Sequence, residues 1–426
     1  MPSDTTAEPG RRRSVQVVLL ALRLANALAK FALAVYMARF LGLAEVGVYG
    51  LLVGAATAVP AILGFGLNDW TARHVVGAPR ERAIAVAVSR FTVTAAAQVV
   101  LQATIWGAIF LLDPPIGRPA LALASAILLL EHLAMDDYVL EIARERPTFA
   151  NLQFFLRAGF WPLPVIGWGL VDPAARTLEV VLGGWLVGLL VMWGVVLVRS
   201  LSGGRWRLLG FDRGYLGRAL PGGVPFWLAD IGAVGNLYLD RFIVSAFLGL
   251  ETTGVYTFFW SFANVVHTLS VNGIVQPLMP RLIAAERSGD PAAFAAERGR
   301  LTRDTVAWAA ILAAGVGIGL PLMLPWFERP LLEASLPVFF VVLVATAMRI
   351  GADGLGYVLY ALGRDRAIAA TALAGVAMTA TFDLLLVPSL GLPGAAVAFL
   401  LVGLGLFAAR ARLVGVEMRR RGAGRQ

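Results

Sequence analysis

The stretch LGLAEVGVYG at residues 41–50 returns as LGLETTGVYT at residues 248–257, with six identical residues in ten. The two copies lie 207 residues apart in a chain of 426 residues, which is close to half its length. Each copy follows one long apolar segment and leads into the next. The repeat therefore predicts a duplicated architecture, with one domain at residues 1–207 and a related domain at residues 208–426.

The composition indicates that both halves lie in a membrane. Hydrophobic residues make up 58% of the chain and charged residues 15%, with a mean hydropathy of +0.76. Soluble proteins are about 45–50% apolar and about 25% charged. Because one membrane span needs about 20 apolar residues, roughly a dozen spans would use most of this chain. The remaining connections are too short for a sizeable catalytic domain, and we expect that the protein is not an enzyme.

Hydropathy, helix breaks and charged loops predict twelve transmembrane helices. The predicted ranges are 14–41, 46–69, 83–112, 117–141, 147–171, 177–199, 218–248, 253–284, 303–326, 334–362, 366–388 and 391–413. Six helices, an even number, separate the two copies of the repeat, so both halves have the same orientation. The sequence thus predicts an all-α polytopic membrane protein of two six-helix bundles related by a parallel internal repeat.

The positions of the cations support this layout. Lys and Arg number 36 against 27 Asp and Glu, a net charge of +9. If the N-terminus is cytoplasmic, 26 of the cations fall in cytoplasmic segments and three, Arg118, Arg176 and Arg329, in outer loops. Cytoplasmic loops of membrane proteins carry such an excess. We therefore expect both termini in the cytoplasm. The excess of positive charge reflects the orientation of the loops in the membrane, and we expect no nucleic-acid partner.

Polar residues in the first predicted span form a stripe. Arg23, Asn26 and Lys30 are spaced by three and four residues, which places them on one face of a helix. Lys30 is the only lysine of the chain and lies near mid-span. Because a charge that faces hydrocarbon costs about 3 kcal/mol or more, we expect this stripe to line a substrate cavity. The alternative is that Arg23 reaches the membrane surface with its long side chain.

Other predicted spans contribute further candidates for this cavity. Asp230 and Arg241 differ by eleven residues, three helical turns, and share one face of their span. Asp230 could meet a cation of the first span. Arg157 is a deep cation in the span at residues 147–171.

The span at residues 334–362 carries another charged pair. Arg349 and Asp353 are four residues apart, close enough for an ion pair across one helical turn. Tyr357 continues the same face. The three residues could line the cavity, or the pair could only stabilise its own helix.

Three prolines mark candidate hinges in the predicted spans. Pro60, Pro221 and Pro225 interrupt or open predicted spans, where a broken helix can bend during a transport cycle.

The chain has no cysteine and its three histidines lack ligand spacing, so we expect no bound metal and no cofactor. A phosphate-binding GxxxxGK[ST] motif is absent, which excludes ATP hydrolysis. Transport would be passive, potential-driven or coupled to an ion such as H⁺ or Na⁺.

Short motifs in order along the chain resemble those of one transporter family. They are MARFLGLAEVGVYG (37–50), GFGLNDWTAR (64–73), LDRFIVSAFLGLETTGVY (239–256), QPLMPRL (276–282) and VPSLGLPGAAVAFL (387–400). They resemble Wzx-type polysaccharide or O-antigen flippases of the multidrug/oligosaccharidyl-lipid/polysaccharide superfamily, whose fold is MATE-like.

This resemblance implies a flippase of the bacterial cytoplasmic membrane. Its substrate would be an undecaprenyl-diphosphate-linked repeat unit, moved by alternating access between the two bundles, with helices 1, 2, 7 and 8 lining the cavity. The implied partners are this lipid-linked oligosaccharide, membrane lipids and the machinery of glycan polymerases and glycosyltransferases. The alternatives are an ion-coupled multidrug or cation antiporter of the same fold, or a non-transporting membrane component of a glycan assembly pathway. A lipid II flippase usually has two more helices than this chain can supply.

Overall fold

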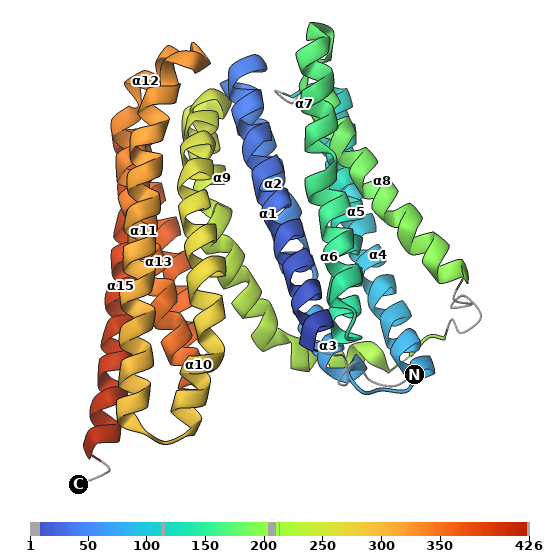
Figure 1. The fold of residues 1–426 in the computed structure, drawn as a ribbon. Helices are drawn as coiled ribbons and strands as arrows, with labels where there is room; N and C mark the ends of the chain where they lie inside the picture. Colours follow the sequence, from blue (N-terminus) through green and yellow to red (C-terminus); the bar gives the residue numbers. More distant parts are fainter. Residues whose placement is uncertain (1–8, 112–115, 203–209, 213, 424–426) are drawn as a thin grey trace. The chain divides into compact units, whose positions relative to one another are not determined.

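The computed structural model describes residues 9–111, 116–202, 210–212 and 214–423, and every regular element among them is helical (Figure 1). The α-helices are α1 (Pro9–Phe40), α2 (Leu43–Leu63), α3 (Leu67–Val75), α4 (Arg80–Leu111), α5 (Arg118–Ala143), α6 (Pro147–Phe155), α7 (Pro162–Val171), α8 (Leu178–Ser202), α9 (Tyr215–Ser270), α10 (Gln276–Arg287), α11 (Pro291–Phe327), α12 (Pro330–Ala334), α13 (Leu336–Ala361), α14 (Asp365–Leu390) and α15 (Leu392–Ala423). Two π-helical turns, Leu156–Phe160 and Val271–Val275, and a 3₁₀ turn, Pro173–Ala175, complete the set.

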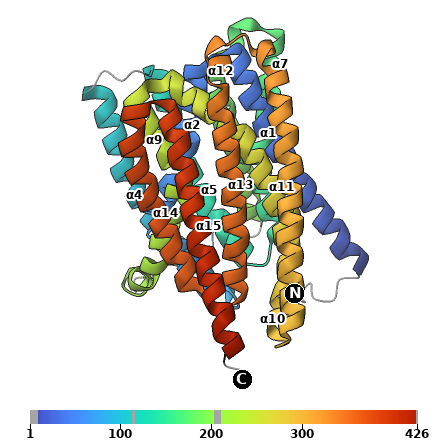
Figure 2. The ribbon, with the colours of Figure 1, turned by 90° about the vertical axis from the view of Figure 1, so that its left-hand side faces the viewer.

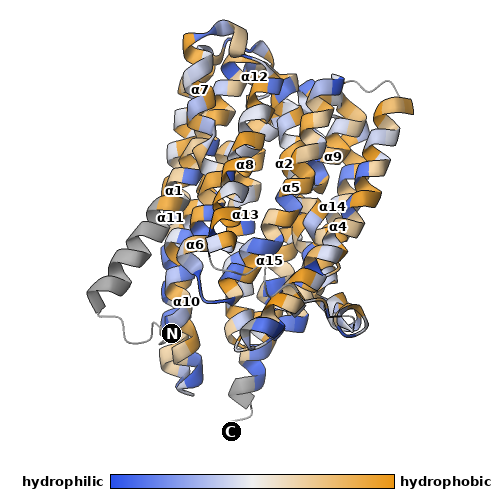
Figure 3. Cartoon of the chain, turned by 90° about the vertical axis from the view of Figure 1, so that its right-hand side faces the viewer, coloured by the Kyte–Doolittle hydropathy of each residue, from blue (hydrophilic) through white to orange (hydrophobic). Residues whose placement is uncertain are grey.

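Each of the twelve predicted spans falls on helix in this structure. Ten helical stretches of the described residues are long and apolar enough to cross a membrane. One of them, Tyr215–Arg287, has 73 residues and contains two predicted spans, and α1 covers the first predicted span. Figure 3 shows apolar residues along most of these helices and many hydrophilic residues on α10. The prediction of an all-α, multi-pass membrane protein is confirmed.

Three predicted spans are interrupted where the sequence suggested continuous helix, and the one at residues 253–284 contains the π-helical turn Val271–Val275. The span predicted at residues 46–69 ends with α2, because Phe65 (φ 52°) and Gly66 (φ 64°) turn the chain before α3 begins. The span predicted at residues 147–171 consists of α6, a π-helical turn and α7, with Pro162 at the start of α7. Proline cannot donate the backbone hydrogen bond of a continuing helix, which accounts for the break before α7.

The repeated motif makes the same turn twice. Gly42, between α1 and α2, has a φ of 138°, and its equivalent Gly249 has a φ of 80° inside α9. Glycine is the residue that adopts such angles without steric cost. The long helix α9 is therefore two helices joined at Gly249, as α1 and α2 are joined at Gly42.

The chain divides into two compact units. Unit 1 comprises Met1–Tyr36 and Ala55–Asp230, and unit 2 comprises Met37–Gly54 and Ile231–Gln426. The end of α1 and the first half of α2 thus belong to unit 2. The domains expected at residues 1–207 and 208–426 remain a prediction, and the two units are described separately below.

Both copies of the repeat pack against each other within unit 2. A Cβ atom on Gly47 would lie 2.2 Å from the carbonyl oxygen of Leu250. A Cβ atom on Gly254 would lie 1.7 Å from the carbonyl oxygen of Leu43. Gly47 and Gly254 are equivalent in the repeat, and so are Leu43 and Leu250. The contact is therefore self-complementary, as at a two-fold interface, and both positions require glycine.

Each unit has its own apolar core. In unit 1, the buried side chains of Leu67 and Trp70 on α3 pack with Leu140 on α5. In unit 2, Val275 and Leu359 belong to a core formed by α10, α11, α13 and α15 together with the preceding π-helical turn. The helices α13, α14 and α15 lie side by side (Figure 2).

Candidate functional site

The predicted stripe on α1 lies against the π-helical turn of unit 1. Asn26 is buried, and a Cβ atom on Gly159 would lie only 3.0 Å from its Cα atom. Lys30 is exposed one turn further along α1, with Nζ 5.9 Å from the ring centroid of Phe154. The side chain of Arg23 lies outside the described residues, so its place in the stripe remains a prediction.

Arg157 is buried and neutralised by an acid. Its Nη1 atom forms a salt bridge with Oε2 of Glu131 on α5. The other carboxylate oxygen, Oε1, accepts a hydrogen bond from the indole N–H of Trp185 at 2.8 Å. The guanidinium also lies 5.2 Å from the ring centroid of Phe154. Arg157 and Glu131 thus form a buried salt bridge, in which Nε of Arg157 keeps no acceptor among the described residues. The sequence placed no partner with Arg157.

Lys30 does not take part in the salt bridge between Arg157 and Glu131. Within the described part of the chain, its ammonium group has neither a salt bridge nor a hydrogen bond. The residue is exposed in the middle of an apolar helix, and Glu131 acts on its charge electrostatically. Since hydrocarbon cannot solvate an ammonium, this position requires water or an anion.

Asp230 lies beside another acid. It is half-buried at the end of unit 1, and Asp69 on α3 is the charged group that acts on it electrostatically. In the described residues no salt bridge joins Asp230 to Lys30, one of the two cations that the sequence suggested as its partner; the other, Arg23, has its side chain outside the described residues. The structure thus does not bring Asp230 into the Lys30 cluster.

A second buried charge pair of unit 1 was missed by sequence reasoning. Arg90 on α4 and Asp136 on α5 lie 2.8 Å apart, and neither side chain is exposed. Asn68 accepts a hydrogen bond from Arg90 Nε at 3.0 Å, and Thr94 bonds both charged residues. Every charge has partners, which indicates a structural role. Arg90, Thr94 and Gln98 at four-residue spacing in an apolar helix were the available signal.

In unit 2, Asp353 binds two partners on other helices. Its Oδ2 atom lies 2.9 Å from Nε2 of His267, and its Oδ1 accepts a hydrogen bond from Arg410 at 3.1 Å. Arg349 donates instead to the carbonyl oxygen of Asn236 at 3.4 Å. The salt bridge between Arg349 and Asp353 that their spacing allows is not formed, because both carboxylate oxygens of Asp353 are occupied from other helices.

The residues predicted on α13 form a polar face in unit 2. Arg349, Asp353 and Tyr357 are each half-buried and follow one another at four-residue spacing. Tyr357 also forms a hydrogen bond with Gln276. A row of partly exposed polar groups inside an apolar span is solvated by water or held by partners and does not face lipid. We call these three residues and His267 the polar face of α13.

Arg241 is buried among aromatic rings in unit 2. Its guanidinium lies 3.9 Å from the ring centroid of Trp260 and 4.8 Å from that of Tyr238. Its Nε and Nη2 atoms have no hydrogen-bond acceptor among the described residues. The aromatic faces stabilise this cation by cation–π attraction. Because only 2% of Arg241 is exposed, the structure does not place it at an open surface.

Two buried acids lie near this arginine. Asp240 accepts hydrogen bonds from the hydroxyl of Tyr256 at 2.7 Å and from the backbone N–H of Arg241 at 2.8 Å. Asp383 on α14 is 1% exposed, and both its carboxylate oxygens lack a partner in the described residues. Asp240 is the charged group that acts on it electrostatically. Two neighbouring carboxylates in apolar surroundings need a proton or a cation to offset their repulsion.

The hinge candidates lie inside helices. Pro60 is within α2, and Pro221 and Pro225 are within α9. Near the first of these, the carbonyl oxygen of Ile62 accepts a hydrogen bond from Trp227 at 2.8 Å. Such a bond satisfies a carbonyl group left free at a helix end. Whether these prolines act as hinges remains a prediction.

Solved transporter structures share this fold. The chain matches an inward-facing multidrug resistance MATE family transporter of the MOP superfamily with a TM-score of 0.71 and 15% identity, over 94% of this chain and 99% of that one. It matches the lipid II flippase MurJ in an inward closed conformation with a TM-score of 0.68 and 10% identity, over 94% and 87% of the two chains.

A third match comes from a transporter with an altered pocket. It is a MOP superfamily transporter from Pyrococcus furiosus, for which the reverse polarity of the binding pocket suggests a different function. Its TM-score is 0.53 at 14% identity, over 97% of this chain and 94% of that one. No family model and no curated protein match the sequence. The chain therefore has the fold of MATE and MOP transporters, which agrees with the MATE-like fold implied by its motifs.

Proposed function

We propose that this protein is a flippase that carries a lipid-linked, anionic oligosaccharide across the membrane by alternating access. Lys30 is the observation that carries this proposal. It is an exposed residue within an apolar span, and its ammonium forms no salt bridge in the described residues, although Glu131 acts on it electrostatically. The diphosphate of an undecaprenyl-diphosphate-linked repeat unit is a ligand that such a group would bind through charge-assisted hydrogen bonds. MurJ, a lipid II flippase, has the same fold, which is compatible with this function.

The polar face of α13 supports a hydrated pathway in unit 2. Arg349, Asp353 and Tyr357 are partly exposed at the depth of an apolar helix. Hydroxyl, guanidinium and carboxylate groups are the partners that sugar hydroxyls use for hydrogen bonds. We propose that this face of unit 2 contacts sugar hydroxyls of the oligosaccharide.

Transport would be coupled to a cation. We propose that H⁺ or Na⁺ binds at Asp383 beside Asp240, because both buried carboxylate oxygens of Asp383 lack a partner in the described residues. Binding of a positive ion there would offset the repulsion between the two acids. Its release on one side of the membrane would then change the charge of unit 2 during a cycle.

The remaining assignments rest on the sequence. We propose that both termini are cytoplasmic, that the membrane is a bacterial inner membrane, and that glycan polymerases or glycosyltransferases are partners. The excess of arginine in alternate loops supports the orientation.

An ion-coupled multidrug or cation antiporter is the second candidate, because the MATE transporters share the fold. Such a protein would need exposed acids to hold its cationic cargo. In the described structure Glu131, Asp240 and Asp383 are buried. Asp230 and Asp353 are half-buried, and Asp353 is bound by His267 and Arg410, whereas Lys30 is exposed and forms no salt bridge. For the Pyrococcus furiosus transporter of this fold, the reverse polarity of the binding pocket suggests a different function. The polarity at Lys30 favours an anionic substrate.

Flipping can be measured with purified protein in liposomes. The substrate is a polyprenyl-diphosphate sugar with a fluorescent label, and a membrane-impermeant reductant bleaches only the label on the outer leaflet. We expect the wild-type protein to flip this lipid, Lys30→Gln to flip it at least about tenfold more slowly, and Lys30→Arg to retain most activity. Arg118→Gln, an exposed cation at the start of α5, is the matched control and should flip at the wild-type rate.

Other outcomes would contradict the proposal. Equal rates of flipping by Lys30→Gln and the wild-type protein would show that Lys30 has no role in binding the substrate. Extrusion of ethidium along a Na⁺ or H⁺ gradient without any flipping would identify an antiporter. Neither activity in folded protein would leave the non-transporting component as the function.

A further inference from the structure

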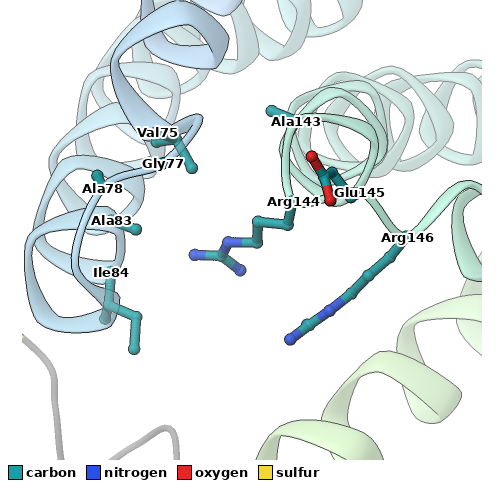
Figure 4. Close-up of a pocket in the computed structure, with 9 residues that line it drawn as sticks. All are labelled: Val75, Gly77, Ala78, Ala83, Ile84, Ala143, Arg144, Glu145 and Arg146. Atoms are coloured by element: carbon teal, nitrogen blue, oxygen red, sulfur yellow. The ribbon is translucent and has the colours of Figure 1, made fainter. Parts of the chain in front are cut away.

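A pocket of about 410 Å³ lies in unit 1, and Lys30 is not among the residues that line it. Its walls are the end of α3 and the following turn, the first turns of α4, and the chain that follows α5 (Figure 4). The lining residues are Val75, Gly77, Ala78, Ala83, Ile84, Ala143, Arg144, Glu145 and Arg146. Ligand sites of proteins begin at about 300 Å³, so the space is adequate for a lipid headgroup.

Two arginine side chains reach into this pocket. Arg144 and Arg146 both extend from the chain after α5 into the open space (Figure 4). The Nη1 atoms of Arg144 and Arg146 lie 3.5 Å and 3.4 Å from the two carboxylate oxygens of Glu141. Glu141 is buried, so it orients both groups from one side. An arginine has five N–H donors, and each guanidinium therefore keeps donors for a ligand.

The opposite wall of the pocket is open and lies near the N-terminal end of α4. Gly77 has a φ of 70°, and a Cβ atom on it would meet nothing within 4 Å. Ala83 and Ile84, near the N-terminal end of α4, line the same wall, and the N–H of Ala83 donates to the carbonyl oxygen of Pro79 at 3.0 Å. The positive end of the helix dipole adds to the field of the two arginines.

The pocket lies where two membrane spans end. The apolar stretch Glu81–Leu111 begins beside it, and the stretch Arg118–Ala143 ends beside it. The two connections at this end, residues 73–82 and 141–146, carry five arginines and three glutamates. Paired arginines recognise phosphate groups well, and basic pockets between spans bind the head groups of anionic lipids. We propose that this pocket binds the phosphate diester of an anionic phospholipid from the surrounding leaflet.

The test uses the purified full-length protein, stripped of lipid, and phosphatidylglycerol as the probe. Retained lipid is counted by native mass spectrometry, and the thermal unfolding midpoint is followed during titration. We expect saturable binding of phosphatidylglycerol and at least about tenfold weaker binding of phosphatidylcholine. Arg144→Gln combined with Arg146→Gln should weaken binding of phosphatidylglycerol at least about tenfold, whereas Arg118→Gln should leave it unchanged.

A matched pair of variants at Gly77 controls for misfolding. Asp and Asn tolerate left-handed backbone and have the same shape, and the space beside Gly77 is open. We expect Gly77→Asp to weaken binding at least about fivefold through its negative charge and Gly77→Asn to bind as the wild-type protein does. Equal binding by these two variants, or by the double arginine variant and the wild-type protein, would overturn the proposal. Inorganic phosphate that displaces the lipid at millimolar concentration would overturn the lipid as the source of the phosphate.

Discussion

Gly47 and Gly254 are 207 residues apart in the sequence, and in unit 2 each abuts the motif copy of the other. The missing Cβ of Gly47 points at the carbonyl oxygen of Leu250, and that of Gly254 at the carbonyl oxygen of Leu43. The identity of these two glycines in the repeat thus has a direct physical cause. Two helices that cross at backbone distance leave no room for a side chain.

Alanine at either glycine should therefore destabilise the protein. A Cβ atom 1.7–2.2 Å from a carbonyl oxygen forces the helices apart, and overpacking of this kind costs about 1–3 kcal/mol. Gly47→Ala and Gly254→Ala should lower the thermal unfolding midpoint by several degrees, measured by tryptophan fluorescence in detergent. Gly315→Ala on α11, where a Cβ atom meets nothing, is the control and should be neutral or stabilising. An unchanged midpoint for Gly254→Ala would contradict the close contact.

The pair formed by Arg157 and Glu131 should behave as one unit. Arg157→Met leaves the carboxylate of Glu131 buried beside Trp185 without its cation. Loss of one partner of a buried pair costs about 3–5 kcal/mol. Adding Glu131→Gln removes the charge but keeps an acceptor for Trp185, so the double variant should unfold at a higher temperature than Arg157→Met. If the two effects simply add, the pair does not interact in solution.

Pro60 should matter for transport more than for stability. Replacement by alanine restores a backbone donor to α2, and a proline within a helix costs about 3 kcal/mol. We expect Pro60→Ala to unfold at an equal or higher temperature but to flip lipid more slowly in the liposome assay. Pro388→Ala, in the last turn of α14, is the control. A Pro60→Ala protein that flips at the wild-type rate is not losing a hinge.

The orientation of the chain can be tested with single cysteines, because the natural sequence has none. Ser288→Cys lies between α10 and α11, and Ala174→Cys lies in the 3₁₀ turn before α8; both positions are exposed. With both termini in the cytoplasm, an impermeant maleimide added to intact cells should label position 174 and not position 288. The reverse labelling pattern would invert the topology, and lysed cells should label at both sites.

Glu328 provides a pH-dependent contact outside the spans. Its carboxylate accepts a hydrogen bond from Arg39 at 2.7 Å, and this bond lowers the pKa of Glu328 from its ordinary value of 4.5. A lowered pKa in the folded state gives stability that is present above pH 4.5 and is lost as the pH falls through the lowered pKa. At neutral pH, Glu328→Gln should therefore unfold at a slightly lower temperature than the wild-type protein. The difference should vanish in acid, and a constant difference at all pH values would exclude the carboxylate as its cause.

Much of the fold could be predicted because the membrane restricts it. A segment such as residues 177–199 is apolar over the thickness of a bilayer. In the bilayer, all its backbone N–H and C=O groups can form hydrogen bonds within the segment only if it is a helix. The structure has α8 at Leu178–Ser202. The breaks at Gly66 and at the π-helical turn around Arg157 were not foreseen, because they depend on backbone angles at single residues.

The partners of the buried charges were harder to predict. The sequence identified Arg157 and Asp353 as charges within spans, but it placed no partner with the first and suggested Arg349 for the second. The structure pairs Arg157 with Glu131, and Asp353 with Arg410, 57 residues further along the chain. Such pairs depend on the rotation of whole helices about their axes, which local spacing does not determine.

The sequence by itself determined that the chain is duplicated, helical and embedded in a membrane, and which spans carry charge. These properties follow from the composition, the internal repeat and the lengths of the apolar segments, which are the same in any fold of the chain. Only the tertiary structure decided which charges remain available, with Arg157 neutralised and Lys30 exposed. The reason is that neutralisation requires atoms of distant segments to approach within about 4 Å, and helix packing alone brings them together.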